Sequence, residues 1–192
     1  MIPSSLKIYL ASKSPRRKKL LEQINLHPGI MHCHFDETFK LGQKPSTIVK
    51  KLALKKMEVA KEQGKNGLVI TADTIVVING KILGKPDSTG QAVAMLKSLS
   101  GKKHFVYTGF CVYNSLNRVL INDYEKTAVT FRKLGDSEIK EYVAGGSPMD
   151  KAGAYGIQDD YGAIFIEKIN GCYYNVVGLP LTKVYQAILK VL

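Results

Sequence analysis

The stretch YLASKSPRRKKLLEQ, residues 9–23, decides the fold class because it contains a strand, a sharp turn and a helix. Ser14 suits the N-cap position of that helix, and Pro15 suits its first position, where a missing N–H costs nothing. Apolar side chains then recur at helical spacing, namely Leu20, Leu21 and Ile24. The stretch therefore predicts one βα unit.

The first turn of this helix holds Arg16, Arg17, Lys18 and Lys19 and contains no acid. A helix N-terminus carries partial positive charge, so cations there are unfavourable unless an anion binds. Exposed N–H groups bind phosphate, and arginine forks strengthen such a site. We interpret Arg16 and Arg17 as a candidate phosphate site, and Lys18 and Lys19 as a solvated basic surface. The alternative is that the whole turn is such a surface.

The rest of the chain alternates between strand and helix patterns, which predicts an α/β fold with a mixed, twisted sheet. Strands are expected at 6–11, 29–35, 67–78, 81–84, 103–114 and 118–134, and helices at 15–25, 46–63, 88–99, 136–145 and 180–191. Asn79-Gly80 between apolar runs predicts a hairpin. The hairpin at 101–134 is expected to extend the sheet or to form a smaller lobe. No linker is apparent, so residues 1–192 are expected to form a single domain.

The chain has 192 residues, of which 45% are hydrophobic, so it can bury a sizeable core. No apolar run is long enough to span a bilayer, and the N-terminus lacks the pattern of a signal peptide. The three cysteines are scattered and are expected to stay reduced. We therefore expect a cytoplasmic protein with no membrane partner.

The net charge of +12 is concentrated in residues 1–65, which hold 14 Lys and Arg against five acids. Nucleic acid, the phosphates of a nucleotide or a solvated basic face would each explain this excess. Charge by itself does not choose among them.

Two acidic positions are candidates for chemistry. Asp73 interrupts the apolar run VITADTIVV, residues 69–77, and an unpaired buried carboxylate is costly. It should be hydrogen-bonded, bound to metal, or placed where a strand ends at a cleft. Asp36 and Glu37 follow another strand, and paired acids near phosphates commonly hold Mg²⁺. The alternatives are a structural, capped Asp73 and a solvated acidic loop.

Two further segments stand out by composition. ILGKPDS, residues 82–88, contains Lys85, and the glycine-rich segment 147–162 contains Lys151 and Gln158. Plain connecting loops would also explain them. The fingerprints of P-loop and dinucleotide-binding proteins are absent from the sequence. His32 and His34 share one face of an expected strand but have no further metal ligands at suitable spacing.

Eight segments in order resemble the motifs of the Maf family: LASKSPRR (10–17), FDE (35–37), LALKK (52–56), TADTIVV (71–77), GKP (84–86), LSG (99–101), DKAGAYGIQ (150–158) and VVGLPL (176–181). The resemblance covers nearly the whole chain. It implies an elongated α/β fold with two lobes around a central cleft, and a homodimer. It also implies hydrolysis of a nucleoside triphosphate to the monophosphate and pyrophosphate, with a divalent cation, Mg²⁺ or Mn²⁺, as cofactor.

The resemblance also implies roles for particular residues. Asp73 is similar to the family's proton acceptor, and Glu37 to a metal or water partner, so both are expected to be catalytic and to bind the metal. Lys56 and Lys85 resemble phosphate ligands, and Ser12 and Arg17 belong to the phosphate-binding turn. One departure from the family pattern is Met57, where alanine is frequent; it is expected to affect only packing.

Substrate choice in the family is associated with the positions of Arg16, Thr74 and Gln158. This set resembles the subgroup that acts on dTTP and UTP, and modified pyrimidine nucleotides are further candidates. A pyrimidine amide edge suits the donor and acceptor of Gln158.

Two alternatives remain open from the sequence: 7-methyl-GTP specificity, and a non-catalytic nucleotide-binding or nucleic-acid-binding regulator of cell division. Segment 50–65 lacks aromatic residues for base stacking, which argues against nucleic acid.

Overall fold

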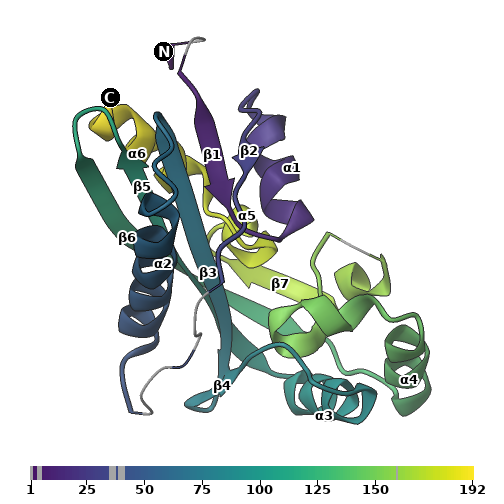
Figure 1. The fold of residues 1–192 in the computed structure, drawn as a ribbon. Helices are drawn as coiled ribbons and strands as arrows, with labels where there is room; N and C mark the ends of the chain where they lie inside the picture. The colour runs from purple at the N-terminus through teal and green to yellow at the C-terminus, as the bar shows by residue number, and fades with distance from the viewer. Residues whose placement is uncertain (1, 4–5, 35–37, 39–41, 159) are drawn as a thin grey trace. The chain divides into compact units, whose positions relative to one another are not determined.

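The computed structural model describes residues 2–3, 6–34, 38, 42–158 and 160–192. Within them, seven strands form one mixed sheet in the order β2-β1-β3-β5-β6-β7, and β4 pairs with β3 (Figure 1). The strands are β1 (Ile8–Ala11), β2 (Gly29–Ile30), β3 (Leu68–Ile78), β4 (Lys81–Leu83), β5 (Lys103–Asn114), β6 (Val119–Phe131) and β7 (Ile166–Asn170). This sheet with its flanking helices confirms the predicted fold class, and the hairpin β5–β6 extends the sheet.

The helices are α1 (Pro15–Gln23), α2 (Pro45–Lys61), α3 (Thr89–Leu99), α4 (Asp136–Ala144), α5 (Tyr173–Val177) and α6 (Leu181–Val191). Short 3-10 turns are η1 (Ser147–Asp150), η2 (Ala152–Ala154) and η3 (Asp160–Phe165). The five predicted helices are all present. The expected strand at 29–35 is only two residues long, and sequence patterns did not predict β7 and α5.

The chain divides into two compact units. The first unit comprises Met1–Asp73, Thr108–Glu125 and Gly178–Leu192, and the second comprises Thr74–Tyr107 and Lys126–Val177. Strands β3, β5 and β6 each contribute residues to both units. The predicted cleft between two lobes stays a prediction.

In the first unit, helix α2 lies unusually close to the sheet. A Cβ atom on Gly109 of β5 would lie 2.3 Å from the carbonyl carbon and oxygen of Val49 in α2. Only glycine permits this approach, because neither backbone can move aside. Buried side chains of α2, the strands and the segment after β2 form a core between them, which includes Ala53, Met57, Ala60, Met31, Val69 and Cys111. Met57 is fully buried here, so its role is in packing as expected.

In the second unit, a larger apolar core surrounds Phe131 of β6 and Phe165, and α3 packs against α4. The predicted Asn79-Gly80 turn joins β3 to β4, with positive φ angles of 48° and 75°. Positive φ at both central residues is typical of the hairpin turn that matches strand twist. The antiparallel register then places Leu83 opposite Val76.

The three cysteines, Cys33, Cys111 and Cys172, are all free thiols. Among the helices in the described ranges, none combines the length and the apolar character needed to cross a lipid bilayer.

Candidate functional site

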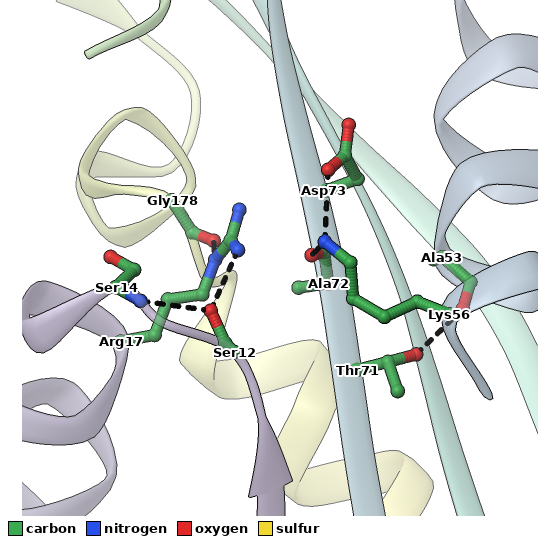
Figure 2. A network of polar contacts seen from close by, with 9 residues as sticks. All are labelled: Ser12, Ser14, Arg17, Ala53, Lys56, Thr71, Ala72, Asp73 and Gly178. Carbon is green, nitrogen blue, oxygen red and sulfur yellow. Dashed lines mark hydrogen bonds and ion pairs between the residues drawn. The ribbon is translucent and has the colours of Figure 1, made fainter. Parts of the chain in front are cut away.

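The edge where β1 ends brings two of the predicted motifs together in the first unit. Strands β1 and β3 are parallel, and their register pairs Ala11 with Thr71. The turn that starts at Ser12 therefore leaves the sheet beside Ala72 and Asp73 (Figure 2). Ligands of α/β sheets bind beyond the carboxyl ends of parallel strands. The possibility that a strand ends at Asp73 is wrong, because β3 continues to Ile78; it is β1 that ends here.

Arg17 is held at this edge by two acceptors. Its Nε donates to the carbonyl oxygen of Gly178 at 2.8 Å, and its Nη1 donates to Oγ of Ser12 at 3.1 Å (Figure 2). Only 9% of Arg17 is exposed. Because a guanidinium is a planar fork, two such contacts orient the whole group.

Ser12 organises the turn between β1 and α1. Besides the bond from Arg17, its Oγ accepts a hydrogen bond from the backbone N–H of Ser14 at 3.2 Å. Both contacts use the oxygen as acceptor, so the hydroxyl proton can still be donated to a ligand. The structure therefore gives Ser12 a role in shaping the turn in addition to the predicted substrate contact.

The start of α1 matches the sequence prediction in position but not in capping. Pro15 is the first helical residue and Ser14 has the extended backbone of an N-cap, yet the Ser14 side chain caps no N–H, and the first turn contains no acid. The positive end of the helix dipole is therefore not offset by a side chain in this turn. Lys18 forms an exposed ion pair with Glu22, and Lys19 is exposed, which fits the interpretation of these lysines as a solvated surface.

Lys56 and Asp73 form a largely buried ion pair. The Lys56 ammonium donates to Oδ1 of Asp73 and to the carbonyl oxygen of Ala72, both at 3.2 Å. The side chains are 10% and 15% exposed. Figure 2 shows Oδ2 of Asp73 pointing away from Lys56. Such a pair loses much of its hydration, so its attraction and its extra hydrogen bond must offset a desolvation cost. The expectation that Asp73 is hydrogen-bonded is confirmed, although Asp73 itself is half-buried.

The other four predicted substrate residues are divided between the two units. Arg16 is half-buried in α1 of the first unit, while Thr74, Lys85 and Gln158 belong to the second unit. Thr74 is half-buried, and both Lys85 and Gln158 are exposed.

Within the second unit, the loops that carry Lys85 and Gln158 are joined by one backbone hydrogen bond. The N–H of Gly153 donates to the carbonyl oxygen of Gly84 at 2.9 Å. Gly153 has a φ of 73°, and a Cβ there would lie 2.9 Å from Cγ2 of Val76. Glycine is therefore required at position 153, because the φ angle is positive and a side chain would collide with Val76.

Among the described residues at this edge of the sheet, Asp73 is the group suited to bind a metal ion. The carboxylate of Asp73 is a ligand that Mg²⁺ and Mn²⁺ accept. Its predicted partner Glu37 lies outside the described residues, so the predicted metal-binding and catalytic roles of Glu37 are untested. Within the described ranges, no cluster of three or more His, Cys, Asp or Glu could hold a metal ion. His32 and His34 are both exposed.

Sequence reasoning assigned no role to two residues that contribute to this geometry. Gly178 supplies the carbonyl that holds Arg17, and its segment VVGLPL was a motif without a function. Thr71 precedes Asp73 by two residues and ties β3 to α2 through a side-chain hydrogen bond. The available signal in the sequence was a threonine within an apolar strand pattern, and the structure shows that it is fully buried.

Comparisons with known proteins agree with the geometry. The family profile described as Maf-like protein matches residues 7–191. A dTTP/UTP pyrophosphatase of Clostridium perfringens (strain SM101 / Type A) is 46% identical over 185 residues, covering 95% of this chain and 96% of the relative. Another, of Caldicellulosiruptor saccharolyticus, is 43% identical over 188 residues, covering 96% and 94%. The chain belongs to the Maf-like protein family.

Proposed function

We propose that this protein hydrolyses dTTP and UTP to the nucleoside monophosphate and pyrophosphate. This chain matches several proteins over almost their whole length, and those proteins are named dTTP/UTP pyrophosphatases. Their similarity supports this activity. The structural observation that carries the proposal is the largely buried Lys56–Asp73 ion pair beside the turn that holds Arg17. A carboxylate next to fixed cations suits attack by water on a polyanionic phosphate chain.

The cations at this edge would neutralise the triphosphate. Arg17 is already oriented by Ser12 and Gly178, so little reorganisation is needed when charge develops on the phosphate oxygens. The positive end of α1 adds to the same field. In the proposed reaction Lys56 contributes a second positive charge while keeping its contact with Asp73.

Asp73 is the proposed general base. With Oδ1 engaged by Lys56, Oδ2 is the oxygen that would orient a water molecule and take its proton. Attack at the α-phosphorus would release pyrophosphate as the leaving group. Asp73 and Glu37 would also hold a divalent cation, Mg²⁺ or Mn²⁺, which neutralises phosphate charge and lowers the pKa of bound water.

The remaining parts of the proposal rest on the family resemblance. Arg16, Thr74 and Gln158 would select the pyrimidine base, and Lys85 would contact a phosphate. We also propose a homodimer and a cytoplasmic location, the latter supported by three free thiols and by nucleotide substrates.

The direct test measures pyrophosphate release from a panel of triphosphates that includes dTTP, UTP, CTP and 7-methyl-GTP, with and without Mg²⁺ or Mn²⁺. We expect dTTP and UTP to be the best substrates and the reaction to need the metal. Preference for 7-methyl-GTP would replace the proposed specificity. Absence of turnover with every triphosphate would favour the non-catalytic regulator instead.

The variant Asp73→Asn tests the assigned base. Removing a general base lowers turnover about 10²- to 10⁴-fold, while asparagine keeps the shape and one acceptor oxygen for Lys56. The thermal unfolding midpoint shows whether the variant is folded. A folded Asp73→Asn enzyme with normal turnover would remove Asp73 from the mechanism.

A further inference from the structure

Thr71 is a fully buried residue of β3 whose side chain contacts helix α2. Its Oγ1 donates a hydrogen bond to the carbonyl oxygen of Ala53 at 2.7 Å (Figure 2). Ala53 lies inside α2, where its carbonyl is the normal acceptor for the N–H four residues later. The helix therefore does not need the hydroxyl to satisfy this carbonyl, and the contact is an additional tie between strand and helix.

This tie lies next to the ion pair. Ala53 and Lys56 are three residues apart, so they lie one above the other on the same side of α2. Thr71 and Asp73 are two residues apart, so they project from the same face of β3. Three successive residues of β3 thus bond to one turn of α2. They do so through the hydroxyl of Thr71, the carbonyl of Ala72 and the carboxylate of Asp73.

Away from the ion pair, Thr71 adjoins the apolar core of the first unit. Ala53, Met57 and Val69 lie in the adjoining core. Cys111 of β5 lies in the same core, and burial raises the pKa of its thiol to about 12. Valine has a branched side chain of similar shape but cannot donate this hydrogen bond, whereas serine can, so the two substitutions differ in the hydroxyl.

We propose that Thr71 is a positioning residue whose hydroxyl sets the place of α2 along β3 and so holds the Lys56 ammonium against Asp73. The proposal rests on the pyrophosphatase function proposed above. Nothing in it requires Thr71 to touch the substrate. A small shift of α2 would move Lys56 relative to the carboxylate that it orients, and displacements of about 1 Å at a reacting group can lower a rate about a hundredfold.

The experiment compares Thr71→Val, Thr71→Ser and the wild-type enzyme with dTTP. Thr71→Val should lower kcat about tenfold or more per folded molecule, with KM changed by less than about threefold, because orientation is lost rather than binding. Thr71→Ser keeps the hydroxyl and should retain kcat within about twofold. A merely structural role would lower the amount of folded protein but not kcat per folded molecule.

Ser115→Ala is the matched control. Its Oγ accepts a hydrogen bond from the N–H of Gly67 at 2.8 Å, at the opposite end of β3 in the same unit. Losing this bond should lower the unfolding midpoint while leaving kcat at the wild-type value. Equal kcat values for Thr71→Val and wild type would overturn the proposal. So would a Thr71→Ser variant as slow as Thr71→Val, because the hydroxyl would then not be the cause.

Crystal structures of the wild type and Thr71→Val give a readout that does not depend on activity. We expect the Lys56 ammonium to leave hydrogen-bond distance of Asp73 or Ala72 in the variant. An unchanged Lys56 would overturn the positioning role even if kcat fell. If the wild type released no pyrophosphate from any triphosphate, the proposed function would fail, and these structures would still decide whether Thr71 positions Lys56.

Discussion

Each of the two compact units contains a pair of interacting polar side chains with little exposure, and the two pairs differ in charge. In the first unit the pair is ionic: buried Lys56 donates to the half-buried carboxylate of Asp73, and buried Arg17 lies at the end of β1. In the second unit, His104 is fully buried among aromatic rings, with its Nε2 atom 2.7 Å from the hydroxyl of Tyr155. Burial lowers the pKa of His104 to about 4 and raises the pKa of Tyr155, so both are neutral near pH 7.

The difference in charge matters because burying a neutral pair costs less free energy than burying ions. A neutral pair such as His104 and Tyr155 needs only its hydrogen bond and its ring contacts, here with Phe131 at centroid distances of 5.0 and 4.7 Å. Buried ions cost more, and apolar replacements of such pairs are often as stable. The ion pair of Lys56 and Asp73 is therefore the better candidate for the proposed chemistry, whereas the neutral pair of His104 and Tyr155 stabilises the fold.

Replacing Lys56 of the ion pair should have the largest effect on stability. Lys56→Met leaves the Asp73 carboxylate nearly buried without its cation, which should lower the free energy of unfolding by about 3 kcal/mol. Pyrophosphate release should also fall, because a phosphate-neutralising charge is lost. Denaturant unfolding at pH 7 and steady-state kinetics measure the two effects.

The double variant Lys56→Met/Asp73→Asn is the control for that experiment. Removing both charges should recover much of the stability, whereas turnover should stay low. A double variant no more stable than Lys56→Met would contradict the view that an uncompensated carboxylate causes the loss.

His104, which lies in the second unit, should make the free energy of unfolding depend on pH. Its folded pKa of about 4 lies below the unfolded value of 6.5. The unfolded chain therefore takes up a proton first as the pH falls. The contribution to stability is complete above about pH 6.5 and is lost progressively toward pH 4, by up to about 3 kcal/mol.

The variant His104→Gln isolates this contribution, because glutamine offers Tyr155 a hydrogen-bonding group that does not titrate in this range. Unfolding free energies of both proteins at pH 7.5 and pH 4.5 give the comparison. We expect the wild type to lose more stability on acidification than the variant does. Parallel losses would show that other groups cause the acid sensitivity.

Arg17→Lys should have a smaller effect, on turnover rather than on stability. An ammonium lacks the planar fork that reaches Ser12 and Gly178 together, so the charge remains but its orientation is lost. We expect kcat/KM to fall about tenfold to a hundredfold. Lys18→Ala on the same helical turn is the control, since its ion pair with Glu22 is exposed; it should change stability by less than about 0.5 kcal/mol and leave turnover intact. Equal effects of the two variants would contradict the assignment of Arg17.

Local patterns were sufficient for most of the secondary structure. Proline and a following apolar period located α1, and the Asn-Gly pair located the hairpin of β3 and β4, because these signals act within a few residues. Helix α5 and strand β7 have five residues each, which is too short for a clear period. The motifs also identified Asp73, Lys56 and Arg17 as candidates.

By itself, the sequence determined the α/β class, the family and the types of residue that the chemistry needs. Only the tertiary structure decided which of them meet: Arg17 with the carbonyl of Gly178, 161 residues away, and Lys56 with Asp73, 17 residues away. The reason is that helix and strand patterns arise from neighbours along the chain. A buried ion pair, in contrast, depends on strand register and on how closely a helix approaches the sheet, and those are set by packing at positions such as Gly109 and Thr71.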